Sequence, residues 1–235
     1  MKNIGIVGGM GPMATAELFR KIIQYTNAAS DQEHIRILID NNPKIPDRTK
    51  AILEGTESPV PWIQLSARGL ISLGADFILI PCNTSHYFFD KIQKGLSAEV
   101  VNMIEETAKA VEGMGIKKAG LLATTGTVQC GVYRRYFQKR GIELIQPDEA
   151  RQNDVMNFIY QGVKASDYQF SAEPFERAAR QLQADGAETL VLGCTELPIG
   201  IKMYGLKMDY VDSLDVLAKT AVVKAGYPLA KEARQ

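Results

Sequence analysis

The sequence predicts an α/β protein of two similar parallel-sheet lobes wrapped by helices, a pseudo-symmetric duplication with its active site in the cleft between the lobes. Short apolar runs alternate with amphipathic stretches, which is the order of a parallel sheet with helical crossovers. A helix–strand unit also recurs within the chain, and each copy ends at a cysteine. The length of 235 residues is enough to bury a core without disulfides or metals.

Six strands are expected from nearly continuous runs of isoleucine, valine and leucine, the composition of strands buried on both faces. They cover residues 4–7, 35–39, 77–80, 119–123, 142–145 and 189–192. A helix is expected after the first strand, because Pro12 suits a first helical turn and apolar residues then recur at helical spacing through Tyr25. Another helix is expected over residues 175–184, with Gly186 as its C-terminal stop.

The repeated unit matches at six positions. Its residues recur 112 positions later, so that Ala67, Arg68, Leu70, Gly74, Ala75 and Cys82 correspond to Ala179, Arg180, Leu182, Gly186, Ala187 and Cys194. A looser match, a strand followed by a glycine turn, begins at Gly5 and at Gly120. Because the identity includes the cysteine as well as packing positions, we interpret it as duplication of a half-domain.

The composition argues against several classes of protein. The 27 basic residues balance 27 acidic ones, which gives no support for electrostatic binding to nucleic acid or to a membrane surface. No apolar run reaches the length of about 18 residues that spans a membrane, and glycines interrupt the N-terminal strand too early for a signal peptide. The 3 widely spaced cysteines do not suggest a disulfide framework. A reducing, cytoplasmic location is therefore expected.

Each copy of the repeat places a cysteine at the carboxyl end of a buried strand. Small polar residues follow it, in Cys82-Asn83-Thr84-Ser85-His86 and in Cys194-Thr195-Glu196. Ligands of open parallel sheets bind outside the carboxyl ends of the strands, where helix N-termini lower the pKa of a thiol. We therefore expect both thiols at the mouth of a sheet, whereas Cys130 is expected to pack as a small apolar residue.

Several chemistries for two such thiols can be compared. A metal site needs more ligands than His34 and His86 supply, and the C-x-x-C motif of a redox dithiol is absent. A nucleophile pair of Cys82 and His86 is conceivable, although we expect His86 to support the site or to lie on a helix surface. The remaining chemistry is proton transfer on both faces of a carbon, in which one thiolate removes a proton and the opposite thiol returns one.

In combination, these motifs resemble a known family. The runs Cys82-Asn83-Thr84 and Gly193-Cys194-Thr195-Glu196, with the N-terminal Gly-Gly-Met-Gly-Pro that includes Met10, are similar to those of cofactor-independent aspartate/glutamate racemases. The N-terminal motif is most similar to aspartate racemases. The resemblance spans the chain.

The resemblance implies two α/β lobes, a site between them and one acid–base cysteine from each lobe. It also implies a homodimer without pyridoxal phosphate or another cofactor. By the same resemblance, the final helix of the chain would return to the first lobe. The expected domains are therefore residues 1–100 with 209–235, and residues 101–208. The implied reaction is two-base racemisation of an acidic amino acid, L-aspartate to D-aspartate first, with a glutamate or broad-specificity racemase as the alternative.

Candidate substrate-binding residues follow from the charge that this reaction develops. A carbon acid next to a carboxylate is weak, so amides and hydroxyls must stabilise the negative charge. The candidates are Asn83, Thr84 and Ser85 in the first lobe and Thr124, Thr125 and Thr127 in the second, with Met10 from the N-terminal motif. For a second carboxylate, Arg48, in the loop of residues 42–48, and Lys164 are candidates that also match basic positions of aspartate racemases. Thr195 and Glu196 are candidates for the amino group, with a helix cap as the other role for Glu196.

Two other classes of function stay open. A dinucleotide-binding oxidoreductase is suggested by Gly9-Met10-Gly11-Pro12-Met13-Ala14, which fits G-x-G-x-x-A, and by Asp40 at the end of the next strand. However, Asp40 lies later than the usual spacing of about 20 residues, and Pro12 restricts the turn. A non-catalytic dicarboxylate-binding module is the other alternative, and it would leave the two matched thiols without a role.

Overall fold

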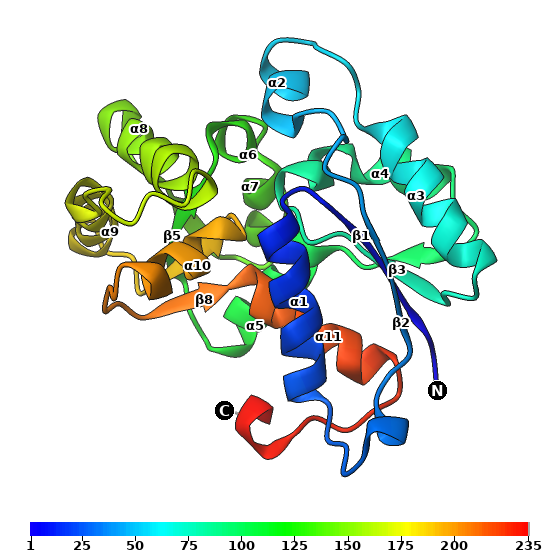
Figure 1. Cartoon of the computed structure of the whole chain (residues 1–235). Coiled ribbons are helices and arrows are strands. Elements are labelled where there is room, and N and C mark those ends of the chain that lie inside the picture. The colour runs from blue at the N-terminus through cyan, green and yellow to red at the C-terminus, as the bar shows by residue number, and fades with distance from the viewer. Residues whose placement is uncertain (235) are drawn as a thin grey trace.

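The computed structural model describes residues 1–234 and contains two four-stranded parallel sheets flanked by helices (Figure 1). The first sheet has the order β2-β1-β3-β4 and consists of β1 (Ile4–Gly8), β2 (Ile37–Asn41), β3 (Phe77–Leu79) and β4 (Glu99–Val100). The second has the order β6-β5-β7-β8 and consists of β5 (Lys118–Ala123), β6 (Glu143–Ile145), β7 (Thr189–Gly193) and β8 (Tyr210–Asp212). The predicted fold class is confirmed, and the two sheets share one strand order.

All the predicted strands are present, with small shifts at their ends. The largest shift is in β2, which begins at Ile37, so that Ile35 is buried just ahead of the strand. The apolar runs do not predict the edge strands β4 and β8, because each contains a single valine and no run of isoleucine, valine or leucine.

The helices cover both faces of each sheet. In chain order they are α1 (Pro12–Tyr25), η1 (Asp31–Glu33), α2 (Arg48–Leu53), α3 (Val60–Ser72), η2 (Thr84–Phe88), α4 (Phe89–Lys94), α5 (Met103–Gly113), α6 (Thr125–Gln129), α7 (Val132–Gln138), α8 (Glu149–Asn157), η3 (Phe158–Lys164), α9 (Glu173–Ala184), α10 (Glu196–Met203), α11 (Ser213–Lys224) and η4 (Lys231–Arg234). The segment η3 is a π-helix and the other η segments are 3-10 helices. Among the described residues, no helix is long and apolar enough to cross a membrane.

The connections α3–β3 and α9–β7 contain the repeat and have the same local geometry. Their glycines, Gly74 and Gly186, have φ angles of 99° and 94°, which L side chains rarely adopt. In each copy the following alanine donates its N–H to the carbonyl of the matched leucine at 3.0 Å. Gly186 therefore ends its helix as predicted, and Gly74 does the same in the first lobe.

A second pair of glycines also occupies matching environments. A Cβ atom at Gly5 would lie 2.7 Å from Ile78, 2.9 Å from Ala75 and 3.3 Å from Leu70. At Gly120 it would lie 3.1 Å from Leu190, 3.1 Å from Ala187 and 3.0 Å from Leu182. The contacting residues are the counterparts of one another in the repeat, so the likeness of the two lobes extends from the strand order to side-chain packing.

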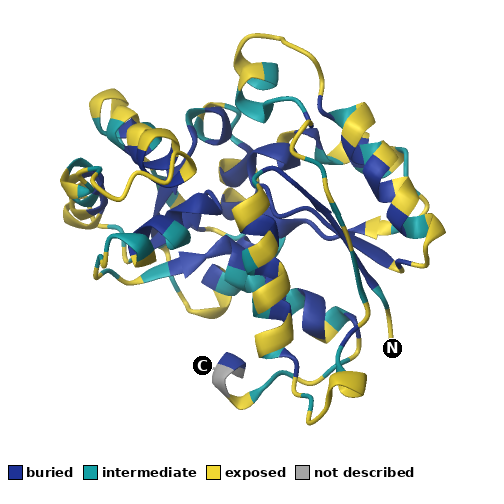
Figure 2. Cartoon of the chain, viewed as in Figure 1, coloured by how far each residue is buried: buried dark blue, intermediate teal, exposed yellow. Residues whose placement is uncertain are grey.

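The cores of the two lobes meet at α5 and α11. Met103 of α5 packs in the first core with Leu214 of α11, whereas Ile104, the next residue, packs in the second core. The central strands β1, β3, β5 and β7 and the inner helix faces are buried, while the outer helix faces are exposed (Figure 2). The edge strands β2 and β6 contain no buried residue, so the expectation that the predicted strands are buried on both faces is wrong for these two. The division of the chain at residues 100 and 208 stays a prediction; β8 pairs within the second sheet, and α11 completes the core of the first.

A charged cluster joins the lobes where β8 leads into α11. Lys21 of α1 forms ion pairs with Asp212 at 3.4 Å and with Asp215 at 2.9 Å. Asp212 also accepts a hydrogen bond from the N–H of Leu214 at the start of α11. Burial raises the pKa of Asp212 to about 6, although Lys21 opposes that rise. The cluster ties the first helix of the chain to its last long helix.

Candidate active site

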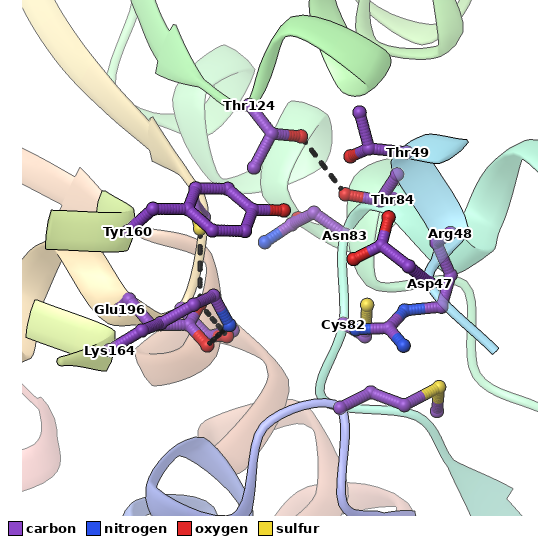
Figure 3. A pocket seen from close by; sticks show the side chains of 13 residues that line it. Asp47, Arg48, Thr49, Cys82, Asn83, Thr84, Thr124, Tyr160, Lys164 and Glu196 are labelled. Atoms are coloured by element: carbon purple, nitrogen blue, oxygen red, sulfur yellow. Dashed lines mark hydrogen bonds and ion pairs between the residues drawn. The ribbon is translucent and has the colours of Figure 1, made fainter. Parts of the chain in front are cut away.

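Residues beyond the carboxyl ends of the strands surround one small pocket between the lobes (Figure 3). Loops after β1, β3, β5 and β7 line it, together with the start of α2 and the π-helix η3. The lining residues are Met10, Asp47, Arg48, Thr49, Cys82, Asn83, Thr84, Thr124, Tyr160, Lys164, Cys194, Thr195 and Glu196. The sheet edges therefore bring together groups that are up to 186 positions apart, from Met10 to Glu196.

Both repeat cysteines line this pocket, one from each lobe. Cys82 follows β3 and Cys194 follows β7, and each is only 6% exposed. Cys130 does not line it; its thiol donates to the carbonyl of Thr127 at 3.3 Å, and burial raises its pKa. Two of the three thiols thus face a common space.

Cys194 lies beside a buried carboxylate. Its Sγ donates to Oε2 of Glu196 at 3.1 Å, and Oε1 of Glu196 accepts from Nζ of Lys164 at 2.5 Å. Burial raises the pKa of Cys194 well above its usual value, and the charge of Glu196 raises it further. Burial also acts to raise the pKa of Glu196, but the Lys164 ammonium outweighs burial and the net direction is downward. Glu196 begins α10, and no side-chain cap is formed there, so its carboxylate belongs to the pocket.

Cys82 lies beside a guanidinium instead (Figure 3). Arg48 is the first residue of α2, not part of the preceding loop as the sequence suggested, and Asp47 caps that helix by accepting from the N–H of Lys50 at 2.9 Å. Nη1 of Arg48 donates to two backbone carbonyls of the loop, while its buried Nε has no hydrogen-bond partner. Burial lowers the pKa of Arg48, but negative charge at Cys82 and at Asp47 raises it and prevails.

His86 holds the loop that carries Cys82. It is 3% exposed, its Nδ1 lies 2.9 Å from the carbonyl oxygen of Cys82, and its Nε2 accepts from the N–H of Met103 at 3.1 Å. Since Nε2 accepts, Nδ1 carries the proton and donates to the carbonyl. Burial lowers the pKa of His86, which favours this neutral ring. His86 therefore supports the site, which is one of the two roles expected for it from the sequence, and it does not lie on the surface.

A ring of hydroxyls crosses from one lobe to the other. Oγ1 of Thr84 lies 3.1 Å from that of Thr124 and 2.9 Å from that of Thr127, and the last two are 3.0 Å apart. Thr84 and Thr124 line the pocket, whereas Thr127 lies behind them. The side chain of Asn83 also lines the pocket but is engaged, because its amide donates to Ser213 and accepts from Tyr133.

Two further candidates from the sequence lie outside the pocket lining. The hydroxyl of Ser85 is buried and donates to Sδ of Met10 at 3.5 Å. Thr125 contacts α8 instead, since its Oγ1 accepts from Gln152 at 3.4 Å. These residues, like Thr127, support the groups that line the pocket.

Three lining residues were not expected from the sequence: Asp47, Thr49 and Tyr160. Tyr160 lies on η3, with Nζ of Lys164 5.7 Å from the centre of its ring. Thr49 of α2 lines the same pocket, and burial raises the pKa of Tyr160. In Figure 3, Tyr160, Lys164 and Glu196 lie on one side of the pocket, and Asp47, Arg48 and Cys82 on the other. Four charged side chains therefore face each other in two pairs of opposite sign.

The same charged residues separate the thiols from a larger outer cavity. The inner pocket holds about 20 Å³ and the outer cavity about 530 Å³. Asp47, Arg48, Lys164 and Glu196 line both. A cavity of about 10–15 Å³ is enough to hold one molecule of water, so the inner pocket has room for water, and an amino acid reaches the thiols only when these side chains move apart.

Metal binding has no ligand cluster to support it. In the part of the chain that the structure describes, no group of three or more histidine, cysteine, aspartate or glutamate side chains is placed to hold a metal ion. The chemistry that the residues supply is therefore that of thiols, hydroxyls and ion pairs.

Comparison with known proteins agrees with this chemistry. A model of the Asp/Glu/Hydantoin racemase family matches residues 7–221. The chain is 29% identical to the broad specificity amino-acid racemase RacX of Bacillus subtilis over 232 residues, which cover 93% of this chain and 96% of that protein. It is 31% identical to a glutamate racemase of Corynebacterium kroppenstedtii over 137 residues, or 57% of this chain and 46% of that one.

A solved structure is similar over the whole chain. The aspartate racemase of Picrophilus torridus superposes with a TM-score of 0.88 at 36% sequence identity, covering 100% of this chain and 98% of that chain.

Proposed function

The chain belongs to the Asp/Glu/hydantoin racemase family, and we propose that this isomerase interconverts the enantiomers of an acidic amino acid, aspartate first, without a cofactor. The observation that carries the proposal is that Cys82 and Cys194 line one pocket from opposite lobes. Inversion of an α-carbon needs a base on one face and an acid on the other. Two facing thiols can supply both.

In the proposed reaction, the thiolate of one cysteine takes the α-proton, and the electron pair of the broken C–H bond stays on the α-carbon and its carboxylate. The thiol of the other cysteine then gives its proton to the opposite face of that carbon. The configuration is inverted, and the two sulfurs have exchanged protonation states. Atoms and charges balance without an oxidant or reductant.

The developing negative charge needs hydrogen-bond donors next to the α-carboxylate. Thr84 and Thr124 are the proposed donors, because their hydroxyls line the pocket from the two lobes. Thr127 would orient these two, and we propose that Asn83 orients the Cys82 loop, since Ser213 and Tyr133 already engage its side-chain amide. Backbone amides after the strands complete the set.

The charged pairs between the inner and outer cavities support an acidic substrate. Arg48 and Lys164 supply two cations for two carboxylates, and the unpartnered Nε of Arg48 is one donor for such a group. Asp47 and Glu196 supply acceptors for the ammonium group, in addition to Thr195. An aspartate zwitterion carries complementary groups to all of these.

A broad-specificity amino-acid racemase is the second candidate. It is favoured by the similarity to RacX over 93% of the chain, and by the outer cavity of about 530 Å³, which can accept side chains longer than that of aspartate. Glutamate, longer by one methylene, is the nearest case. An apolar pocket discriminates only weakly between substrates that differ by one methylene, so an aspartate racemase and a broad-specificity racemase would differ here only in degree.

A substrate panel tests the proposal directly. The enzyme is incubated in D₂O with aspartate, glutamate, alanine and other amino acids, and loss of the α-proton is followed by NMR while chiral chromatography measures inversion. We expect exchange and inversion of aspartate in both directions, with alanine slower by about a hundredfold for lack of the second carboxylate. Absence of exchange for every amino acid would refute the proposed reaction and favour the non-catalytic dicarboxylate-binding module. Equal rates across the panel would favour broad specificity.

The dinucleotide-binding alternative is disfavoured by the packing of the glycine turn. The N–H of Gly9 donates to the hydroxyl of Thr15 at 3.0 Å, and a Cβ at Gly9 would lie 2.3 Å from the backbone of Asn42. A Cβ at Gly11 would lie 3.2 Å from the carboxylate of Glu196, which would repel a pyrophosphate. The glycines serve close packing of the protein against itself.

The homodimer and the cytoplasmic location remain parts of the proposal. Three free cysteines suit a reducing compartment. Leu65 on α3 is 68% exposed and Leu73, directly after that helix, is 63% exposed, and exposed apolar side chains of this kind suit an interface between two copies. Light scattering should then give twice the chain mass of 25.9 kDa, and a mass of one chain at micromolar concentration would refute the dimer.

A further inference from the structure

The two pocket thiols have unlike neighbours at a position where the lobes otherwise match. Two residues after Cys82 comes Thr84, and two residues after Cys194 comes Glu196. A hydroxyl in one lobe thus corresponds to a carboxylate in the other. The difference gives Cys194, and not Cys82, a carboxylate two residues along the chain that accepts a hydrogen bond from its thiol. The carboxylate of the first lobe, Asp47, lines the pocket next to Arg48 instead.

Glu196 is held as an ionised acceptor. Its side chain is 7% exposed, and Lys164 donates to its Oε1 at 2.5 Å. Because the ammonium stabilises the carboxylate, the pKa of Glu196 stays below its usual value in spite of burial. An ionised carboxylate only accepts hydrogen bonds. The contact of 3.1 Å between its Oε2 and Sγ of Cys194 therefore places a proton on that sulfur.

The charged group that acts most directly on each thiol differs in sign. Around Cys194 are Glu196, which contacts its sulfur, then Lys164 and the phenols of Tyr133 and Tyr160. Around Cys82 are the Arg48 guanidinium, Asp47 of the same pocket lining, and Lys164. A neighbouring cation favours a thiolate, and a neighbouring carboxylate favours a thiol.

We propose that Glu196 is the positioning residue that keeps the proton on Cys194 in the resting enzyme, so that Cys82 is the sulfur that acts first as the base. The inference rests on the proposed racemisation and adds an order to it. The enzyme then acts first on the enantiomer whose α-hydrogen faces Cys82. The chemical step moves that hydrogen to Cys82 and leaves a thiolate on Cys194 beside Glu196. Before the next identical turnover, Cys82 must lose that proton to solvent and Cys194 must take one up.

Alkylation of the thiols tests the order without requiring turnover. The whole enzyme is treated with iodoacetamide over a range of pH, and peptide mass spectrometry measures the rate at Cys82, Cys194 and Cys130. Both cysteines are 6% exposed as whole residues and line the same pocket, so the pH dependence of each rate, followed separately, reports the thiolate content of that cysteine. At neutral pH we expect Cys82 to react about tenfold faster or more, with Cys194 reacting only as the pH is raised.

The Glu196→Gln variant should change the reactivity of Cys194 much more than that of Cys82, because Glu196 contacts the sulfur of Cys194. Without the carboxylate, Lys164 faces Cys194 unpaired, so alkylation of Cys194 should begin at lower pH and its rate at neutral pH should rise about tenfold. Circular dichroism should show that the fold is intact. Glu196→Thr, which copies the first lobe, is the second variant and should act in the same direction. Glu176→Gln is the matched control, because Glu176 forms an exposed ion pair with Arg180 on α9.

The inference would be overturned by any of three results. The first is equal alkylation rates of Cys82 and Cys194 in the wild-type enzyme, and the second is faster alkylation of Cys194. The third is a pH profile of Cys194 alkylation that stays unchanged in both Glu196 variants. The failure of the proposed function would look different. In that case the substrate panel would show no exchange of any α-proton, while the alkylation order still reported the charge around the two thiols.

Discussion

In the first lobe, the pocket thiol of Cys82 has the guanidinium of Arg48 and the side chain of Thr84 as neighbours. In the second lobe, the pocket thiol of Cys194 has the carboxylate of Glu196, which is paired with Lys164, as its neighbour. The cations themselves come from matching places, since Arg48 lies between β2 and α3 and Lys164 lies between β6 and α9. Each is therefore in the connection that leads from the second strand of its lobe to the repeated helix. Duplication accounts for paired thiols and paired cations. Asp47 supplies a carboxylate to the pocket from the first lobe, but Glu196 has no counterpart at the matched position two residues after Cys82, and among the described residues it is the carboxylate that accepts a hydrogen bond from a pocket thiol.

Removing either thiol is expected to have the largest effect. Cys82→Ser and Cys194→Ser should each lower the racemisation rate about a thousandfold, because each step needs a group that transfers a proton near neutral pH and a serine hydroxyl does not. Chiral chromatography of aspartate measures the loss, and Cys130→Ser should keep the native rate. Full activity of either pocket variant in both directions would show that one thiol is dispensable.

Replacing Arg48 with lysine separates its charge from its shape. The Arg48→Lys variant keeps a cation beside Cys82 but loses the fork that grips a carboxylate at two points. We expect kcat/KM for aspartate to fall about thirtyfold, or about 2 kcal/mol, and that for alanine to fall much less. Arg68→Lys on the exposed face of α3 is the control. An equal loss for both substrates would mean that Arg48 does not bind the second carboxylate.

The matched glycines compare the packing of the two lobes. Gly5→Ala should lower the free energy of unfolding by about 2 kcal/mol and Gly120→Ala by about 1 kcal/mol, because overpacking a core usually costs about 1–3 kcal/mol. The larger cost is expected at Gly5, whose added methyl would lie 2.7 Å from Ile78, against 3.0 Å for the tightest contact at Gly120. Urea denaturation of the two variants measures both values. The reverse order would show that the first lobe adjusts more easily.

The hydroxyl of Tyr160 should give the smallest effect. Tyr160→Phe removes one hydroxyl from the pocket lining, and we expect KM to rise about threefold with kcat nearly unchanged, because one neutral hydrogen bond contributes about 1 kcal/mol. Thr49→Val removes a hydroxyl of the lining from the other lobe. The two losses should add in the double variant, and a double variant no weaker than either single one would show that the two side chains act together.

The sequence predicted the parts of the fold that depend on local pattern. Apolar runs identify the central strands because both of their faces are buried, and the repeat marks Cys82 and Cys194 because the same glycine turn leads to each. The edge strands β4 and β8 contain one valine each, so no run of apolar residues marks them. Arg48 was placed in a loop because α2 has only 6 residues, with Asp47 as its cap.

The contacts within the site depend on the tertiary structure. Lys164 and Glu196 are 32 positions apart and meet only because η3 and the start of α10 lie at the same edge of the sheet. Tyr160 was missed because it lies in a π-helix, and no sequence pattern predicts a π-helix. Its wider turn brings Tyr160 and Lys164 to the pocket together. Ser85, Thr125 and Thr127 were read as substrate contacts from their position after a strand, yet their side chains lie behind the pocket lining.

The shared helix α11 also sets an order of assembly during protein synthesis. The second sheet is continuous in the chain from β5 to β8, so a ribosome delivers all of it before α11. The first sheet is complete by β4, but its core still lacks Leu214, Leu217 and Ala221 of α11, and the N–H of Lys2 lacks the carbonyl of Ala225. The lobe that is translated first is therefore the one whose core closes last, and until then its apolar strands depend on chaperones or on partial collapse for protection.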